Sequence, residues 1–110
     1  MAASDDIHVS FTRSGGVTGS TISGDFDGRE LSPEDAEALR DHVETADFFA
    51  QPAVFEAPDR KEDKFQWEVT AEAEGRRHTV RFTDGSEPAP LRELTRYLLG
   101  LLRRRATAGS

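Results

Sequence analysis

Residues 64–84 read KFQWEVTAEAEGRRHTVRFTD, and this stretch decides the fold. It predicts two β-strands joined by the two-residue turn EG at 74–75, in which glycine supplies a positive φ angle. The turn fixes the register of the two strands. The pairs predicted on the apolar face are Trp67 with Phe82, Val69 with Val80, and Ala71 with His78.

The same register matches charges on the other face of this hairpin. The pairs there are Glu68 with Arg81, Thr70 with Thr79, and Glu72 with Arg77. A slip of one residue would bury the polar row and expose the apolar one, so a single register is expected. Each buried apolar side chain contributes about 1.5–3 kcal/mol, whereas an exposed ion pair contributes under about 1 kcal/mol.

A second hairpin is predicted near the N-terminus. Apolar and polar residues alternate over 7–12, and the alternation resumes between Ile22 and Phe26. The sequence SGG at 14–16 interrupts the pattern and is expected to form the tip of this hairpin.

Two amphipathic helices complete the predicted elements. The first begins with Ser32 as N-cap and Pro33 at the first helical position, and it ends near Asp47. The second follows Pro90 and carries leucines at helical spacing. Between the first helix and the 64–84 hairpin, residues 50–64 are predicted to form a long loop.

The resulting order, ββαββα, predicts an α+β fold with an antiparallel sheet and two helices packed on one face. At 110 residues the chain is long enough for one core and too short for two domains. We expect a single domain over residues 7–105, between a disordered start at 1–6 and a disordered tail at 106–110.

Charge is distributed unevenly along the chain, whose net charge is −7. Residues 1–91 carry 9 basic and 20 acidic residues, whereas residues 92–110 carry 5 arginines and one glutamate. The acidic body disfavours nucleic acid as a partner. The arginines at 103–105 could bind phosphate, but they are better explained as cations that offset the negative end of the last helix.

Several classes of function are disfavoured by what the sequence lacks. No apolar run could span a bilayer and no secretory signal is recognisable, so a cytoplasmic protein without a membrane partner is expected. With no cysteine, disulfides and thiolate metal sites are excluded. The histidines at 8, 42 and 78 lack metal-ligand spacing, and no catalytic motif occurs. We therefore predict a protein that is not an enzyme and uses no metal or other cofactor.

Three motifs follow one another along the chain: FTRSGGVTG at 11–19, LSPEDAEALRDHVETADFF at 31–49, and GRRHTVRFTDG at 75–85. Together with the leucine-rich last helix they cover nearly the whole chain after residue 6. In this order they resemble the emfourin family, inhibitors of protealysin and related thermolysin-like zinc metalloproteases. The resemblance implies a proteinaceous inhibitor that occludes the catalytic cleft of such an enzyme. The alternative is a non-catalytic interaction module without inhibitory activity.

The tip of the first hairpin is the candidate inhibitory site. The resemblance implies a target cleft that holds extended peptides and favours an apolar side chain just after the cut. Two glycines would let the backbone approach such a cleft closely, and a hairpin loses little entropy on docking. The candidate residues are Ser14, Gly15, Gly16 and Val17, with Val54 and Phe55 as a secondary contact. Alternatively, the glycines only form the turn. The free protein is expected to be a monomer.

Overall fold

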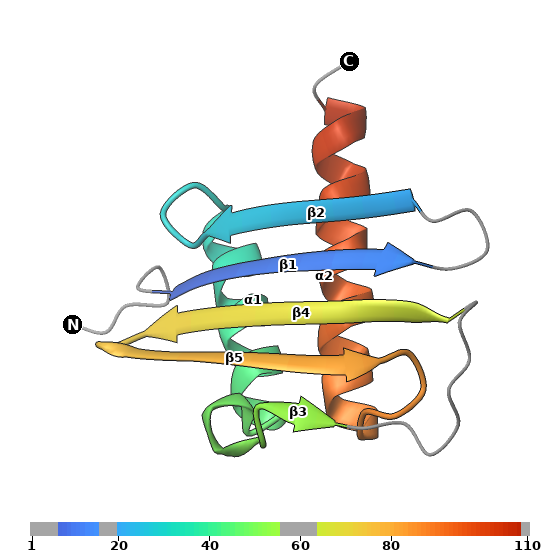
Figure 1. The fold of residues 1–110 in the computed structure, drawn as a ribbon. Coiled ribbons are helices and arrows are strands. Elements are labelled where there is room, and N and C mark those ends of the chain that lie inside the picture. The colour runs from blue at the N-terminus through green and yellow to red at the C-terminus, as the bar shows by residue number, and fades with distance from the viewer. Residues whose placement is uncertain (1–6, 16–19, 56–63, 109–110) are drawn as a thin grey trace.

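The computed structural model describes residues 7–15, 20–55 and 64–108 (Figure 1). The strands are β1 (Ile7–Gly15), β2 (Ser20–Asp27), β3 (Val54–Phe55), β4 (Phe65–Ala73) and β5 (Arg76–Thr83). The helices are α1 (Pro33–Thr45), the short 3-10 helix η1 (Phe48–Ala50) and α2 (Ala89–Ala108).

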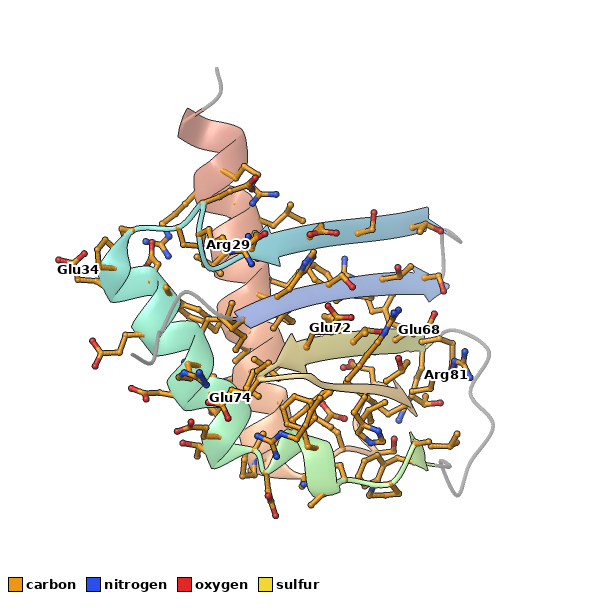
Figure 2. All side chains as sticks on the ribbon, turned by 90° about the vertical axis from the view of Figure 1, so that its left-hand side faces the viewer. Arg29, Glu34, Glu68, Glu72, Glu74 and Arg81 are labelled. Carbon is orange, nitrogen blue, oxygen red and sulfur yellow. The ribbon has the colours of Figure 1, made fainter. Side chains whose placement is uncertain are left out.

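The strands form one sheet in the order β2-β1-β4-β5-β3. Neighbouring strands are antiparallel except for β3 and β5, which are parallel. Both α-helices lie behind the same face of the sheet in Figure 1, and the quarter-turn of Figure 2 keeps them together on one side. The prediction of an α+β domain with both helices on one face is therefore confirmed.

The segment between α1 and β4 differs from the predicted loop. A loop was expected over residues 50–64, but Val54–Phe55 form β3. The short helix η1, Phe48–Ala50, reaches the start of the same segment. The Arg81 N–H donates to the Ala53 carbonyl at 2.7 Å, so this segment pairs with the outer edge of β5. An unpaired strand edge leaves backbone groups without partners, which favours this added strand. The sheet is mixed rather than wholly antiparallel, and the order ββαββα is met only roughly.

The register predicted for the hairpin of β4 and β5 is confirmed. Trp67 lies opposite Phe82, with their ring centroids 6.0 Å apart. On the other face, Arg81 Nη2 donates to Glu68 Oε2 at 3.0 Å. The two turn residues both have positive φ, 54° and 79°, as the predicted turn requires.

One hydrophobic core fills the space between the sheet and the helices. The predicted stripe of α2 is buried along its length, since its leucines at 91, 94, 98 and 101 are at most 4% exposed. The largest fully buried side chains are Phe26, Phe48, Leu39, Leu91, Leu94 and Leu98. Strands and helices thus all contribute to the same core, which holds the sheet ends in fixed positions.

The ends of the helices agree with the prediction at one terminus and differ at another. α1 begins as expected, because Ser32 Oγ accepts a hydrogen bond from the Asp35 N–H at 3.1 Å and Pro33 opens the helix. α2 continues to Ala108, so residues 106–108, predicted to belong to a disordered tail, are helical. Residues 1–6 and 109–110 lie outside the described part of the chain.

The arginines at the end of α2 contact the rest of the domain. Arg104 Nη2 donates to Asp35 Oδ1 at 3.1 Å. Arg105 Nη1 donates to the Asp25 carbonyl at 2.9 Å, and its guanidinium carbon lies 4.5 Å from the centroid of the Phe26 ring. These side chains therefore link α2 to α1 and to β2, in addition to offsetting the negative helix end.

Asp35 lies at the centre of the link between the helices. The Tyr97 hydroxyl is 3.2 Å from both the carbonyl oxygen and the carboxylate Oδ1 of Asp35. Burial raises the pKa of the Asp35 carboxyl, but the hydrogen bond and charge of Arg104, aided by Tyr97 and Ser32, outweigh burial and hold this pKa below its usual 3.8. The folded protein therefore favours the ionised carboxylate.

We expect ionised Asp35 to stabilise the fold at neutral pH. A pKa that is lowered on folding contributes stability that is complete above the usual value and is lost as the pH falls through the lowered one. Asp35→Asn should therefore reduce the free energy of unfolding at neutral pH, and its difference from the parent should narrow at about pH 3. Urea denaturation at both pH values measures this difference.

Asp41→Asn is the matched control for this experiment, because Asp41 is exposed on the same helix. It should change the free energy of unfolding much less than Asp35→Asn does at neutral pH. If Asp35→Asn lowers the free energy of unfolding as much in acid as at neutral pH, the ionised Asp35 carboxylate does not stabilise the fold.

Candidate functional site

β1, which carries Ser14 and Gly15 of the predicted tip, ends on the right of the sheet in Figure 1. β1 ends there at Gly15, β2 begins there at Ser20, and β4 begins there at Phe65. Gly15 has both Ser20 and Phe65 as Cα partners, so the strand leading to the tip is paired on both sides up to its last described residue. Gly16 and Val17 lie outside the described residues, and their role stays a prediction.

Ser14 and Gly15 are the candidate residues that the structure describes. Ser14 is opposite Gln66 in β4. Gly15 has a φ of +97°, and a Cβ there would lie 3.2 Å from the Lys64 carbonyl oxygen. A residue with a side chain is strained at such a φ. The backbone therefore favours glycine at position 15, whether or not the tip also contacts a partner.

The predicted secondary contact lies on the far edge of the sheet, where Val54 is level with Thr12 of β1. Phe55 is opposite Phe82, which is opposite Trp67, and Trp67 is opposite Arg13. Neighbouring strands are about 4.8 Å apart, so β3 lies about 14 Å from β1 across the sheet. Two strands, β4 and β5, thus separate the secondary contact from β1, and Val54 and Phe55 are level with Thr12 and Arg13 rather than with Gly15.

Val54 and Phe55 point to opposite faces of the sheet. Phe55 packs against the core on the helix side. Val54 is opposite Arg81 on the face that the helices leave open, and it is 50% exposed. Among the described residues, Val54 is the one large apolar side chain that is exposed. Only Val54 of this pair is therefore accessible as an apolar contact.

Arg13 is a feature of this end of the sheet that the sequence analysis missed. It has the same strand parity as Ile7, Val9 and Phe11, so its side chain lies on the helix side. Its guanidinium carbon lies 4.1 Å from the centroid of the Phe65 ring. The alternation along β1 could have indicated its face, but not the stacking, which depends on the register between β1 and β4.

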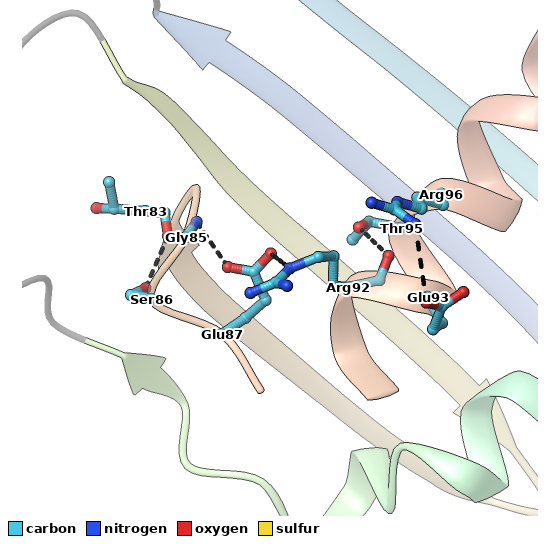
Figure 3. Close-up of polar contacts among 8 residues, drawn as sticks. All are labelled: Thr83, Gly85, Ser86, Glu87, Arg92, Glu93, Thr95 and Arg96. Atoms are coloured by element: carbon cyan, nitrogen blue, oxygen red, sulfur yellow. Dashed lines mark hydrogen bonds and ion pairs between the residues drawn. The ribbon is translucent and has the colours of Figure 1, made fainter. Parts of the chain in front are cut away.

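The connection from β5 to α2 is fixed by a buried carboxylate (Figure 3). The Glu87 side chain is 1% exposed, its Oε1 accepts from the Gly85 N–H at 2.8 Å, and its Oε2 lies 3.5 Å from Arg92 Nε. The Ser86 hydroxyl donates to the Thr83 carbonyl at 2.7 Å. A buried charge needs such partners. These contacts hold the end of β5 in place beside the start of β4.

The open face of the sheet is polar. Figure 2 shows Glu68, Glu72 and Arg81 extending from the strands on the side away from the helices. Glu72 Oε2 lies 3.6 Å from Arg77 Nη1, and the other predicted pairs on this face are also in contact. These side chains are paired across strands, as a solvent-facing sheet surface requires.

Residues 7–15, 20–55 and 64–108 contain neither a cluster of metal ligands nor a membrane-spanning helix. In that part of the chain, no three His, Cys, Asp or Glu side chains are grouped as metal ligands would be. No helix there is long and apolar enough to cross a membrane. The expected cytoplasmic location stays a prediction.

Comparison with known protein families decides the assignment. A family model described as Emfourin matches residues 11–99. The chain belongs to the emfourin family. This emfourin match includes the predicted tip, the whole sheet from Phe11 onward and just over half of α2, and membership indicates a role in metalloprotease inhibition. Searches of curated proteins and of solved structures found no match.

Proposed function

We propose that this protein inhibits a thermolysin-like or protealysin-like zinc metalloprotease by occluding its catalytic cleft. The observation that carries the proposal is the emfourin match over residues 11–99, which includes the whole candidate tip. The protein acts by binding, and its own chain supplies no catalytic group.

The position of the tip supports this proposal. The tip joins β1 to β2, and β1 is paired on both sides by β2 and β4. A segment held in this way loses little conformational entropy when it docks. The glycines at 15 and 16 leave room for close backbone approach, and Val17 supplies an apolar side chain. The tip sequence therefore combines small residues with one apolar side chain, which suits a narrow peptide-binding cleft.

Val54 provides a second contact in this proposal. It is exposed and lies on the far edge of the sheet, level with Thr12 and about 14 Å from β1 by strand spacing. A cleft rim that extends from the tip across the sheet would reach Val54. This contact is secondary, because a single valine buries little apolar area.

Titration of a thermolysin-like protease with the purified protein tests the proposal. We expect activity against a peptide substrate to fall linearly with added protein and to vanish near one equivalent. A serine protease assayed in parallel should be unaffected. Full metalloprotease activity at a large excess of the protein would contradict the proposal, and binding without loss of activity would support the non-inhibitory interaction module.

A further inference from the structure

The guanidinium of Arg13 is held against aromatic rings at the tip end of the sheet. Its central carbon lies 4.1 Å from the centroid of the Phe65 ring and 5.8 Å from that of the Trp67 ring. Arginine stacks on aromatic faces through cation–π attraction. The stacking fixes the orientation of the planar guanidinium before any partner arrives.

Two buried donors at this place have no acceptor. Arg13 Nε and Trp67 Nε1 are buried, and neither has a hydrogen-bond partner among the described residues. Trp67 itself is 5% exposed. Buried N–H groups normally have partners, and each exception calls for an explanation. The two residues are opposite one another in β1 and β4, so both orphan donors belong to one site.

Among the described residues of this acidic chain, no carboxylate forms an ion pair with Arg13. The protein has 21 acidic and 14 basic residues. Seven other arginines of the described part form ion pairs with carboxylates. Arg13 forms no ion pair with any described residue. No carboxylate of the described residues therefore neutralises the charge of Arg13.

The stacking also sets where the charge lies along the strand. The Arg13 guanidinium stacks over Phe65, and Phe65 is opposite Gly15, the last residue of the tip that the structure describes. The guanidinium therefore lies level with the base of the tip rather than farther inside the sheet. A partner that receives the tip would meet the Arg13 side chain at the same end.

We infer that Arg13 is a partner-binding residue, whose guanidinium receives a carboxylate of the target protease beside the tip. The inference rests on the proposed function and adds the chemistry of the contact. Arginine presents several N–H donors in a planar fork that matches a carboxylate. The affinity that the charge contributes depends on ionic strength. The affinity from the apolar and backbone contacts of the tip does not.

Inhibition constants of the parent, Arg13→Met and Arg29→Met against a thermolysin-like protease test the inference. Methionine keeps an unbranched apolar stem over the rings and removes the charge and the donors. Arg29 is the matched control, because it is exposed in the turn after β2, at the opposite end of the sheet (Figure 2). We expect Arg13→Met to weaken inhibition about tenfold or more at low salt, and less at high salt. Arg29→Met should stay within about twofold of the parent.

Thermal unfolding of each variant separates binding from folding. If Arg13→Met does not fold, Arg13→Lys replaces it, because lysine keeps the charge but loses the planar fork, and its inhibition should still be weaker than that of the parent. If the Arg13 variants fold and inhibit like the parent, this inference is overturned and the proposed function is not. An equal loss in Arg29→Met, or a loss that is independent of salt, also overturns it. A parent that does not inhibit overturns the proposed function and this inference with it.

Discussion

Gly16→Trp is expected to weaken inhibition of a thermolysin-like protease at least about a hundredfold, or ~2.7 kcal/mol, while the protein remains folded. Gly16 follows the last described residue of β1 and belongs to the tip that the proposal places in the cleft. A bulky indole there would prevent the close backbone approach that glycine allows. Inhibition constants measure the loss, and circular dichroism confirms the fold.

Two further variants make this experiment specific. Val17→Asp should also weaken inhibition, because it places a charge where an apolar pocket is expected. Gly100→Trp is the matched control, since Gly100 lies in α2 and nothing lies within 4 Å of the position that a Cβ would take. It should inhibit like the parent. If Gly16→Trp and Val17→Asp fold and inhibit like the parent, the tip is not the inhibitory site, and Val54 becomes the leading candidate.

Trp67→Ala is expected to lower the free energy of unfolding by about 3–5 kcal/mol, as the loss of a large buried aromatic does. Trp67 is 5% exposed and packs between Phe82 and Phe11, with ring centroids at 6.0 and 5.7 Å. Trp67 and these two neighbours come from three adjacent strands, so the cavity would lie in the middle of the sheet's inner face. Relaxation into it would require several strands to move.

Glu72→Ala is the comparison for this variant. Glu72 is in the same strand but on the open face, where its carboxylate lies 3.6 Å from Arg77 Nη1. An exposed ion pair of this kind contributes under about 1 kcal/mol. Chemical denaturation of both variants gives the two losses. Losses of comparable size would contradict the burial of one face and the exposure of the other.

The sequence predicts the hairpin of β4 and β5 well because two independent patterns agree there. The apolar residues and the opposite charges alternate in the same register, and the EG turn between them fixes that register locally. The start of α1 is similarly local, since Ser32 caps Asp35 three residues away. Such features depend on neighbours in sequence, so they can be predicted from the chain alone.

Other features depend on contacts between distant segments. β3 has two residues and pairs with a strand that lies 27 positions later, so no local pattern marks it. The contact of Arg105 with Asp25 joins residues 80 positions apart. At the candidate site, the tip could be proposed from its glycines, but the stacking of Arg13 on Phe65 could not. That stacking needs the pairing of β1 with β4, which no turn between them determines.

The position of Arg105 has a consequence for how this protein behaves at high concentration. β2 is the outermost strand on its side of the sheet, and such a strand can recruit another chain by backbone pairing and start aggregation. Arg105 already donates to the Asp25 carbonyl of β2 and covers the Phe26 ring. The last turns of α2 thereby protect an edge that β1 leaves open. By occupying this carbonyl and covering this ring, Arg105 disfavours pairing of β2 with a second chain.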